Sequence, residues 1–183
     1  ASGIAVGLEP VDCAHLANVA AGLVVGKLGT AAINLDDLRR AVMNYPASKH
    51  QDKIVSNLEA RSIVEGWRKS GQVIGFTNGC FDILHPGHVS MLQQAASSCD
   101  RLIVGLNNDD SVRRLKGEGR PAQSVSARAY MLASLPHVDL VVIFSDDTPE
   151  SLITELIPDV LVKGADYSRR DVVGADFVES IGG

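Results

Sequence analysis

The segment VIGFTNGCFDILHPGH, residues 73–88, joins an apolar run to the start of a helix. Its first six residues are continuously apolar or small, which is typical of a parallel strand covered on both faces. Gly79 lets the backbone turn tightly and leaves room for a ligand. Pro86 suits the first turn of a helix, where its missing N–H costs nothing. We therefore expect His85 just before this helix and His88 within its first turn.

Similar apolar runs recur along the chain and alternate with segments of helical periodicity. The runs are VIGFTN (73–78), RLIVGLN (101–107), VDLVVIF (138–144) and DVLVKG (159–164), and the helical segments lie near 87–98, 110–115, 125–134 and 149–156. This alternation predicts an α/β fold, a Rossmann-like doubly wound parallel sheet with right-handed crossovers. Ligands bind such sheets beyond the carboxyl ends of the strands, which is where the histidines fall.

The chain divides into two unequal parts. Residues 1–42 are rich in Ala, Gly and Val, and VDCAHLANVAAGLVVGKLG predicts a helix that is apolar on most sides and belongs inside a larger body. The segment MNYPASKHQDKIVSN carries Pro, Ser and mixed charge, which predicts a linker at 43–55. The second domain then covers 56–183. A subunit interface over the apolar helix at 10–27 would make the protein a homo-oligomer.

Bulk composition excludes several classes of protein. The 183 residues carry a formal net charge of −5, which argues against general affinity for nucleic acid. Cys13, Cys80 and Cys99 form no C-x-x-C pair and suit a reducing compartment better than a disulfide scaffold. The longest apolar run, near 16–25, is too short to span a bilayer. We expect a cytoplasmic protein with small-molecule partners and no membrane or nucleic-acid partner.

The chemistry of the histidine segment favours an anion. Free amides and the positive end of the dipole at a helix N-terminus attract phosphate, and two imidazoles add donors there. A bound polyphosphate would favour their charged forms. This arrangement fits attack on a nucleotide phosphorus, where the protein positions groups and stabilises charge. Two alternatives remain: His85 and His88 as capping and packing groups, or a zinc site with Cys80 that lacks a fourth ligand at ordinary spacing.

At this point the chain resembles a known family. Gly79-Cys80-Phe81-Asp82 with His85-Pro86-Gly87-His88 is similar to the G-x-F-D-x-x-H-x-G-H signature of the nucleotidyltransferase superfamily. The resemblance implies that His85 and His88 stabilise the transition state of nucleotidyl transfer. It further implies that the nucleotide and its phosphates are contacted by Thr77, Asn78, Gly79, Phe81, Asp82 and Gly87.

Later strand ends are expected to complete the site. The resemblance implies a catalytic Lys116 after the second strand, a phosphate-binding Arg120, a substrate-binding Arg128 at a helix start, and nucleotide-binding Lys163 and Asp166 after the fourth strand. Ala127 stands where the family usually has Glu or Asp before that arginine. From the residues alone, Lys116, Arg128 and Lys163 can also be solvent-exposed charges.

Three longer segments narrow the resemblance. FTNGCFDILHPGHVSMLQQAA, VGLNNDDSVRRLKGEGRP and PDVLVKGADYSRRDVVGAD resemble the adenylyltransferase part of the bifunctional heptose-phosphate kinase/heptose 1-phosphate adenylyltransferase family. The resemblance implies transfer of AMP from ATP to D-glycero-β-D-manno-heptose 1-phosphate, for lipopolysaccharide synthesis. It implies Mg²⁺ bound mainly by the triphosphate, and we expect no other metal site.

The resemblance extends to residues 1–42, which are similar to the last helices of a ribokinase-type kinase domain. We expect no kinase activity, because the anion-hole and base motif of that domain would fall before residue 1. Relatives continue past residue 183 with a strand and a Ser/Thr-rich turn that helps bind the triphosphate. Two alternatives to adenylyl transfer stay open. The first is a cytidylyltransferase acting on an alcohol phosphate. The second is a non-catalytic nucleotide-binding or assembly module.

Overall fold

The computed structural model describes residues 10–25, 33–43, 50–164 and 168–183. The chain divides into two compact units, Ala1–Ser48 and Lys49–Gly183. The first unit contains α2 (Pro10–Val25) and α3 (Leu35–Met43). Asn34 stabilises the start of α3, because its side-chain oxygen accepts a hydrogen bond of 2.7 Å from the amide of Asp37. The second unit contains the sheet and the segment 73–88.

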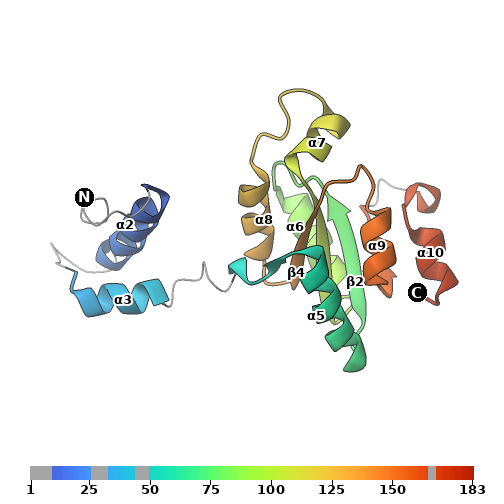
Figure 1. The fold of residues 1–183 in the computed structure, drawn as a ribbon, viewed down its shortest axis with the longest axis horizontal. Helices are drawn as coiled ribbons and strands as arrows, with labels where there is room; N and C mark the ends of the chain where they lie inside the picture. Colours follow the sequence, from blue (N-terminus) through green and yellow to red (C-terminus); the bar gives the residue numbers. More distant parts are fainter. Residues whose placement is uncertain (1–9, 26–32, 44–49, 165–167) are drawn as a thin grey trace. The chain divides into compact units, whose positions relative to one another are not determined.

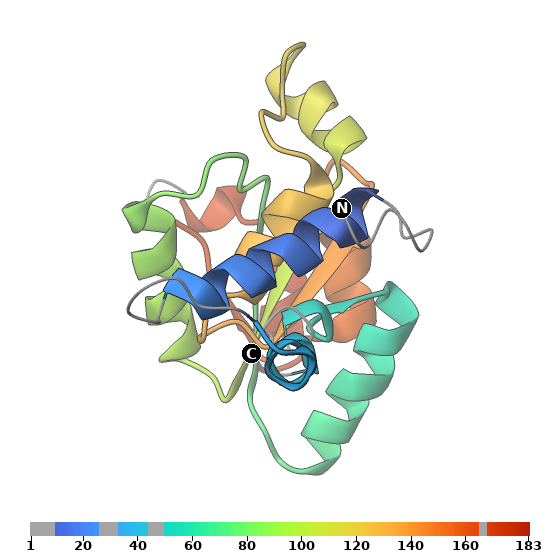
Figure 2. The ribbon, with the colours of Figure 1, turned by 90° about the vertical axis from the view of Figure 1, so that its left-hand side faces the viewer.

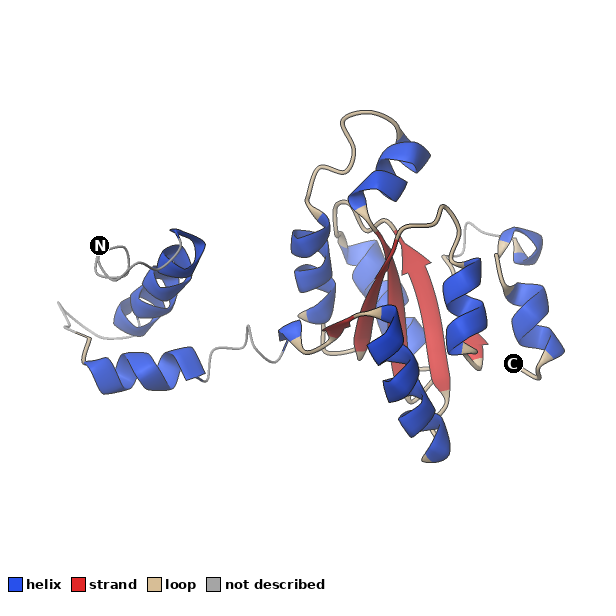
Figure 3. Ribbon diagram, viewed as in Figure 1, coloured by secondary structure: helices blue, strands red, loops and turns tan. Residues whose placement is uncertain are grey.

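Five parallel strands form the centre of the second unit, with helices on both sides (Figures 1 and 3). They are β1 (Ile54–Val55), β2 (Ile74–Gly79), β3 (Arg101–Asn107), β4 (Leu140–Phe144) and β5 (Val160–Leu161). Their spatial order is β1-β4-β3-β2-β5, and each neighbouring pair is parallel. Each predicted apolar run thus contains a strand, and the predicted doubly wound parallel sheet is confirmed.

The helices cover the two faces of this sheet in two groups. They are α5 (Asn57–Lys69), α6 (Pro86–Ala96), α7 (Asp109–Lys116), α8 (Val125–Ala133), α9 (Glu150–Leu156), the 3-10 turn η1 (Arg169–Asp171) and α10 (Ala175–Ser180). Buried residues of α5, α9 and α10 form one core cluster, and those of α6 and α8 form the other. Figure 2 shows α5 and α6 on opposite sides of the strands.

The strands bury alternate residues in the two clusters. Ile74 and Phe76 of β2 belong to the cluster with α5, whereas Leu102 and Val104 of β3 belong to the cluster with α6. Successive side chains of a strand point to opposite faces, and here both faces are covered. This is why the runs are continuously apolar rather than alternating.

The predicted linker at 43–55 ends in the sheet. Ile54 and Val55 form the edge strand β1 and pair with Val141 and Val142 of β4. Two residues are too few to show any periodicity, so the sequence pattern did not reveal this strand. Residues 44–49 lie outside the described residues.

Helix α5 follows β1 directly and begins as its sequence indicates. Ser56 and Glu59 have the spacing of a capping box, and both reciprocal hydrogen bonds are present. The amide of Ser56 donates to Glu59 Oε2 at 2.8 Å. Gly71 then ends the helical segment with a positive φ of 74°.

Aspartates pin the amino ends of the inner strands. Asp100, Asp139 and Asp159 each precede a strand. Their carboxylates accept hydrogen bonds from the amides of Val73, Leu102 and Ile74, at 2.8, 2.8 and 2.7 Å. Each bond joins one strand to the start of its neighbour.

The carboxyl ends of the strands lie at the opposite edge, on the side where α7 stands in Figure 1. The chain runs from β2 to β3 on one side of β2, and later crosses back to place β5 on the other side. Such a reversal of strand order is the usual position of a ligand crevice. The turn after β2 therefore stands where a ligand is expected.

Candidate active site

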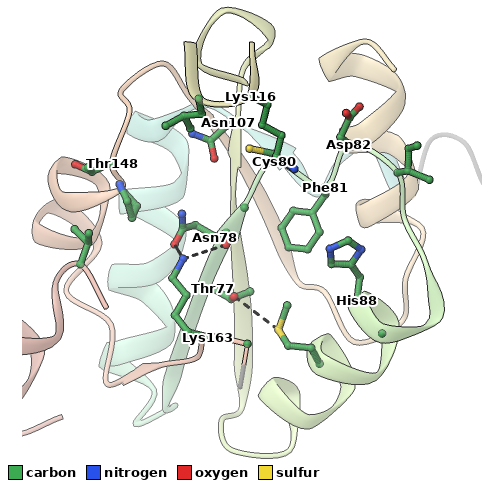
Figure 4. Close-up of a pocket in the computed structure, with 18 of the residues that line it drawn as sticks. Thr77, Asn78, Cys80, Phe81, Asp82, His88, Asn107, Lys116, Thr148 and Lys163 are labelled. Carbon is green, nitrogen blue, oxygen red and sulfur yellow. Dashed lines mark hydrogen bonds between the residues drawn. The ribbon is translucent and has the colours of Figure 1, made fainter. Parts of the chain in front are cut away.

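A pocket of about 1090 Å³ opens at this edge of the sheet. Pockets for small molecules commonly enclose about 300–1,000 Å³, so this one is large enough for a nucleotide. The predicted site residues that line it are Thr77, Asn78, Gly79, Phe81, Asp82, His85, Gly87, His88, Lys116, Arg120 and Lys163. The fold thus brings together side chains from β2, α6, α7 and the segment after β5 (Figure 4).

The two histidines occupy the start of α6, as predicted. Pro86 is the first helical residue and His85 is the N-cap, but its side chain makes no capping hydrogen bond. The His85 ring instead stacks on His88, with 3.8 Å between ring centroids. The edge of this pair meets Phe81, whose ring centroid lies 5.2 Å from that of His88. Pro86 has no N–H, and the amide of His88 donates to the carbonyl oxygen of His85 at 2.9 Å. The amide of Gly87 is therefore the donor of the first turn that stays available to an anion.

His88 is harder to protonate than a free imidazole before any ligand binds. Burial, and then electrostatic repulsion from His85 and Lys116, keep the pKa of His88 below its usual value. Its Nδ1 atom is buried and has no hydrogen-bond partner among the described residues. A bound polyphosphate would oppose these effects and raise the pKa of His88.

The glycines of the motif make room for neighbouring side chains. A Cβ on Gly79 would lie 3.1 Å from Cε2 of Phe81, and a Cβ on Gly87 would lie 3.0 Å from Cε1 of His85. The space expected for a ligand beside Gly79 is therefore filled by the Phe81 ring. Phe81 itself has a φ of 43°, a left-handed conformation that is uncommon for a residue other than glycine. This backbone turn directs the ring toward His88 (Figure 4).

Lys163 bridges the ends of β2 and β5. Its Nζ atom donates hydrogen bonds to Oδ1 of Asn78 and, at 3.3 Å, to the carbonyl oxygen of Asn78. Figure 4 shows the lysine reaching across to the asparagine. The ammonium group thus lies at the point where the strand order reverses, inside the pocket. Asp166, predicted to lie beside it, is outside the described residues.

Lys116 and Arg120 line the pocket from the end of α7 and from the segment that follows it, respectively. Lys116 is the last residue of α7, and Arg120 pairs with Asp82 at 2.7 Å. The Asp82 carboxylate is almost fully buried, and its second oxygen accepts from the amide of Ala122 at 2.6 Å. Burial alone would raise the pKa of Asp82, but hydrogen bonds from Arg120 and the loop amides outweigh it and lower that pKa. Asp82 is thus ionised and faces the loop.

Arg128 does not line the pocket, which corrects the prediction that it binds the substrate. Its side chain has 0% relative exposure and pairs with Asp109 at 2.6 Å, so it is not an exposed helix cation either. It also donates to the carbonyl oxygens of Cys80, Asn107 and Gln123, at 2.6, 2.8 and 3.1 Å. Asp109 on α7 supplies its carboxylate partner. Arg128 therefore joins the turn after β2, the end of β3 and the segment before α8.

Other lining residues were not predicted. Asn107 ends β3, and its amide donates to Ser111 Oγ at 2.8 Å. Asp147 and Thr148 follow β4, and Asp171 lies on η1. Asn107, Asp147 and Thr148 stand at or just after a strand's carboxyl end, and this positional rule is the signal that could have located them. No motif singles them out.

Two alternative chemistries find little support in the geometry. Cys80 lines the pocket, but burial raises the pKa of its thiol despite the charges of Lys116 and Arg128. The thiol therefore stays protonated and is a poor nucleophile. Among the described residues, no group of three or more His, Cys, Asp or Glu is arranged to hold a metal ion.

The cytidylyltransferase-like family matches residues 76–180, which contain the histidine pair and most of the pocket. The chain belongs to the cytidylyltransferase-like family.

Similar proteins match this chain over its whole length. The bifunctional protein HldE of Rhodospirillum rubrum is 57% identical over 183 residues, which are 100% of this chain and 37% of that protein. The protein of the same name from Acidiphilium cryptum is 58% identical, again over 100% of this chain and 37% of the relative. The chain thus spans little more than a third of the length of these relatives. The predicted resemblance to a bifunctional family is confirmed.

A solved structure supports the fold. The lipopolysaccharide core biosynthesis protein of Thermoplasma volcanium has a TM-score of 0.52 and 23% sequence identity, over 61% of this chain and 90% of that protein. Such low identity is informative about the fold alone. In the described part of this chain, no helix has the length and apolar character needed to cross a membrane.

Proposed function

We propose that the second unit transfers AMP from ATP to D-glycero-β-D-manno-heptose 1-phosphate, which gives ADP-heptose and pyrophosphate. The observation that carries this proposal is the stacked pair of His85 and His88 at the open start of α6. Lys116, Arg120 and Lys163 line the same pocket, so a triphosphate would meet three cations. The relatives named bifunctional protein HldE support a role in one half of a two-activity enzyme.

In this reaction the phosphate oxygen of the sugar attacks the α-phosphorus directly. A new P–O bond forms as the bond to the β-phosphate oxygen breaks, and pyrophosphate leaves with the electron pair. Imidazole and ammonium donors then stabilise the negative charge that gathers on the transition state and on pyrophosphate. The protonated thiol of Cys80 takes no covalent part.

Mg²⁺ would enter with its nucleotide. It keeps several waters and is commonly bound by substrate phosphates with one or two carboxylates. The pocket carboxylates of Asp82 and Asp147 are already paired with Arg120 and Arg114. The ion would neutralise triphosphate charge, while the histidines and lysines orient the nucleotide. A cytoplasmic homo-oligomer acting on small molecules remains part of the proposal.

A pyrophosphate-release assay tests the function. The protein is incubated with Mg²⁺ and either ATP or CTP, and with either heptose 1-phosphate or glycerol 3-phosphate. We expect release only with ATP and heptose 1-phosphate. Release with CTP and glycerol 3-phosphate would favour the cytidylyltransferase alternative, to which the family description points. Thermal stabilisation by ATP without any release would favour a non-catalytic module.

A further inference from the structure

The buried carboxylate of Asp82 accepts its hydrogen bonds from the loop between α7 and α8. One oxygen accepts from Nη1 of Arg120 at 2.7 Å, and the other accepts from the amide of Ala122 at 2.6 Å. The nearby amide of Gln123 also helps to lower the pKa of this carboxyl group. In Figure 4 the Asp82 carboxylate points away from His88. A phosphate would also be repelled by this negative charge.

Residues 118–122, between α7 and α8, have little else to hold them, whereas the next residue, Gln123, is also held through its carbonyl oxygen by Arg128 at 3.1 Å. Gly117 and Gly119 adopt positive φ values of 89° and 83°, and a Cβ at either position would meet nothing within 4 Å. The amide of Arg120 donates at 3.4 Å to Gly117 within the loop itself. In the described part of the chain, the hydrogen bonds that tie residues 118–122 to another segment are those to Asp82. Few buried contacts make such a segment easy to open.

The hydrogen bond between Arg120 and Asp82 also orients the Arg120 guanidinium in the site. The Arg120 side chain is 46% exposed and lines the pocket. Its guanidinium carries five donors in a planar fork, and the bond to Asp82 uses one nitrogen. Among the described residues the other nitrogens have no hydrogen-bond partner, so they are available to a phosphate. A carboxylate fixed behind the guanidinium keeps that fork pointing into the pocket.

We propose that Asp82 is a positioning residue that holds the 117–123 loop closed, so that Arg120 faces the histidine pair, and that it is not a nucleotide ligand. This replaces the role that the family signature suggested for Asp82. Opening of the loop at its two glycines would withdraw Arg120 from the pocket, whereas Lys116 would stay at the end of α7. The kinetic part of this inference rests on the proposed function, whereas the structural part does not.

The chain offers a matched control for removing this carboxylate. Asp139 also binds one arginine and one backbone amide, because it accepts from Arg101 at 3.0 Å and from Leu102 at 2.8 Å. It lies at the amino end of β4, at the opposite edge of the sheet from the pocket. Asp139→Asn therefore removes a comparable set of contacts without touching the loop.

The test combines hydrogen exchange with kinetics. In Asp82→Asn we expect the amides of Ala122 and Gln123 to exchange about tenfold faster or more, while the β3 amides stay protected. The kcat/KM for ATP should fall about 10- to 100-fold, as expected when a catalytic cation is misplaced. Asp139→Asn should change neither quantity. Since Asp82 acts through Arg120, Arg120→Met should cost less in the Asp82→Asn background than in the wild type.

Unchanged exchange at Ala122 in Asp82→Asn overturns the proposal, and so do fully additive kinetic effects. If Asp82→Asn fails to fold, Arg120→Met carries the exchange test, because it removes the half-exposed partner. Faster exchange at Ala122 in that variant supports the inference, and unchanged exchange refutes it. If no substrate pair releases pyrophosphate, the proposed function fails while the exchange data still decide how the loop is held.

Discussion

Replacement of Arg128 by Met should destabilise the second unit more than removal of any surface charge. The guanidinium has 0% exposure and makes four hydrogen bonds, three of them to backbone carbonyls. Methionine fills much of the same volume but leaves those carbonyls and the Asp109 carboxylate without a donor. Breaking one side of a buried charged pair typically costs about 3–5 kcal/mol. Three buried carbonyls lose their donor, but the Asp109 carboxylate is 34% exposed and can be hydrated. The expected loss is therefore about 4 kcal/mol, in the middle of that range.

Urea unfolding followed by tryptophan fluorescence measures this cost. The chain has one tryptophan, Trp67, which packs against the core cluster of the second unit. It therefore reports on the unit that holds Arg128. With an m-value of about 2 kcal/mol per M, a loss of about 4 kcal/mol lowers the midpoint by about 2 M.

A second arginine provides the control. Arg114 also bonds a carboxylate and a carbonyl, those of Asp147 and Ser145, but its side chain is 50% exposed. Arg114→Met should therefore cost at most about 1 kcal/mol. Arg128→Met could instead lower the free energy of unfolding by less than about 1 kcal/mol, or by as much as Arg114→Met does. Either result would show that the buried hydrogen bonds of Arg128 do not hold the surrounding segments together.

Further measurements bear on the site itself. His88→Ala should lower kcat about 10²- to 10³-fold, which is far more than it weakens ATP binding; full activity would remove the histidine from the mechanism. Because the free His88 pKa is lowered and a polyphosphate would raise it, ATP binding should take up a proton at pH values between the free and the bound pKa of His88. Affinity should then fall as pH rises between the free and bound pKa values, and calorimetry in two buffers should show no such uptake for His88→Asn. Gly105→Ala would place a Cβ 2.8 Å from Phe76 Cζ and should cost about 1–3 kcal/mol in urea unfolding; an unchanged midpoint would show that the ring moves freely. EDTA should stop pyrophosphate release but leave the melting temperature of the ligand-free protein unchanged. A lower melting temperature in EDTA would reveal a metal bound to the protein itself.

The longer strands were predictable because burial on both faces leaves a plain signal in the sequence. β2, β3 and β4 each fill most of a continuous apolar run. β5 contains only two residues, Val160 and Leu161, but it lies within the predicted run 159–164. β1 also contains two residues, which is below the length at which a period can be recognised. It is selected by pairing with β4, and this tertiary contact has no local signature.

The site was predictable where backbone chemistry decides it. Glycine, proline and histidine at fixed spacing placed His85 and His88 at the start of α6. The direction in which a long or charged side chain turns is a different matter. Arg128 opens a helix as expected, yet it points into the protein because four acceptors meet there. Asp82 lies within the motif, yet it faces a loop that sequence alone cannot place beside it.

The three aspartates at the amino edge of the sheet have a consequence for how this scaffold can change. Asp100, Asp139 and Asp159 fix the register of neighbouring strands from the end that never touches a ligand. A shift of one residue would break these bonds and move every core side chain to the opposite face of the sheet. Segments at the other edge can therefore be exchanged or lengthened while alignment is kept. Natural selection can therefore change the residues of the pocket while the fold is kept. The same holds for an engineer who grafts loops for a different nucleotide or acceptor.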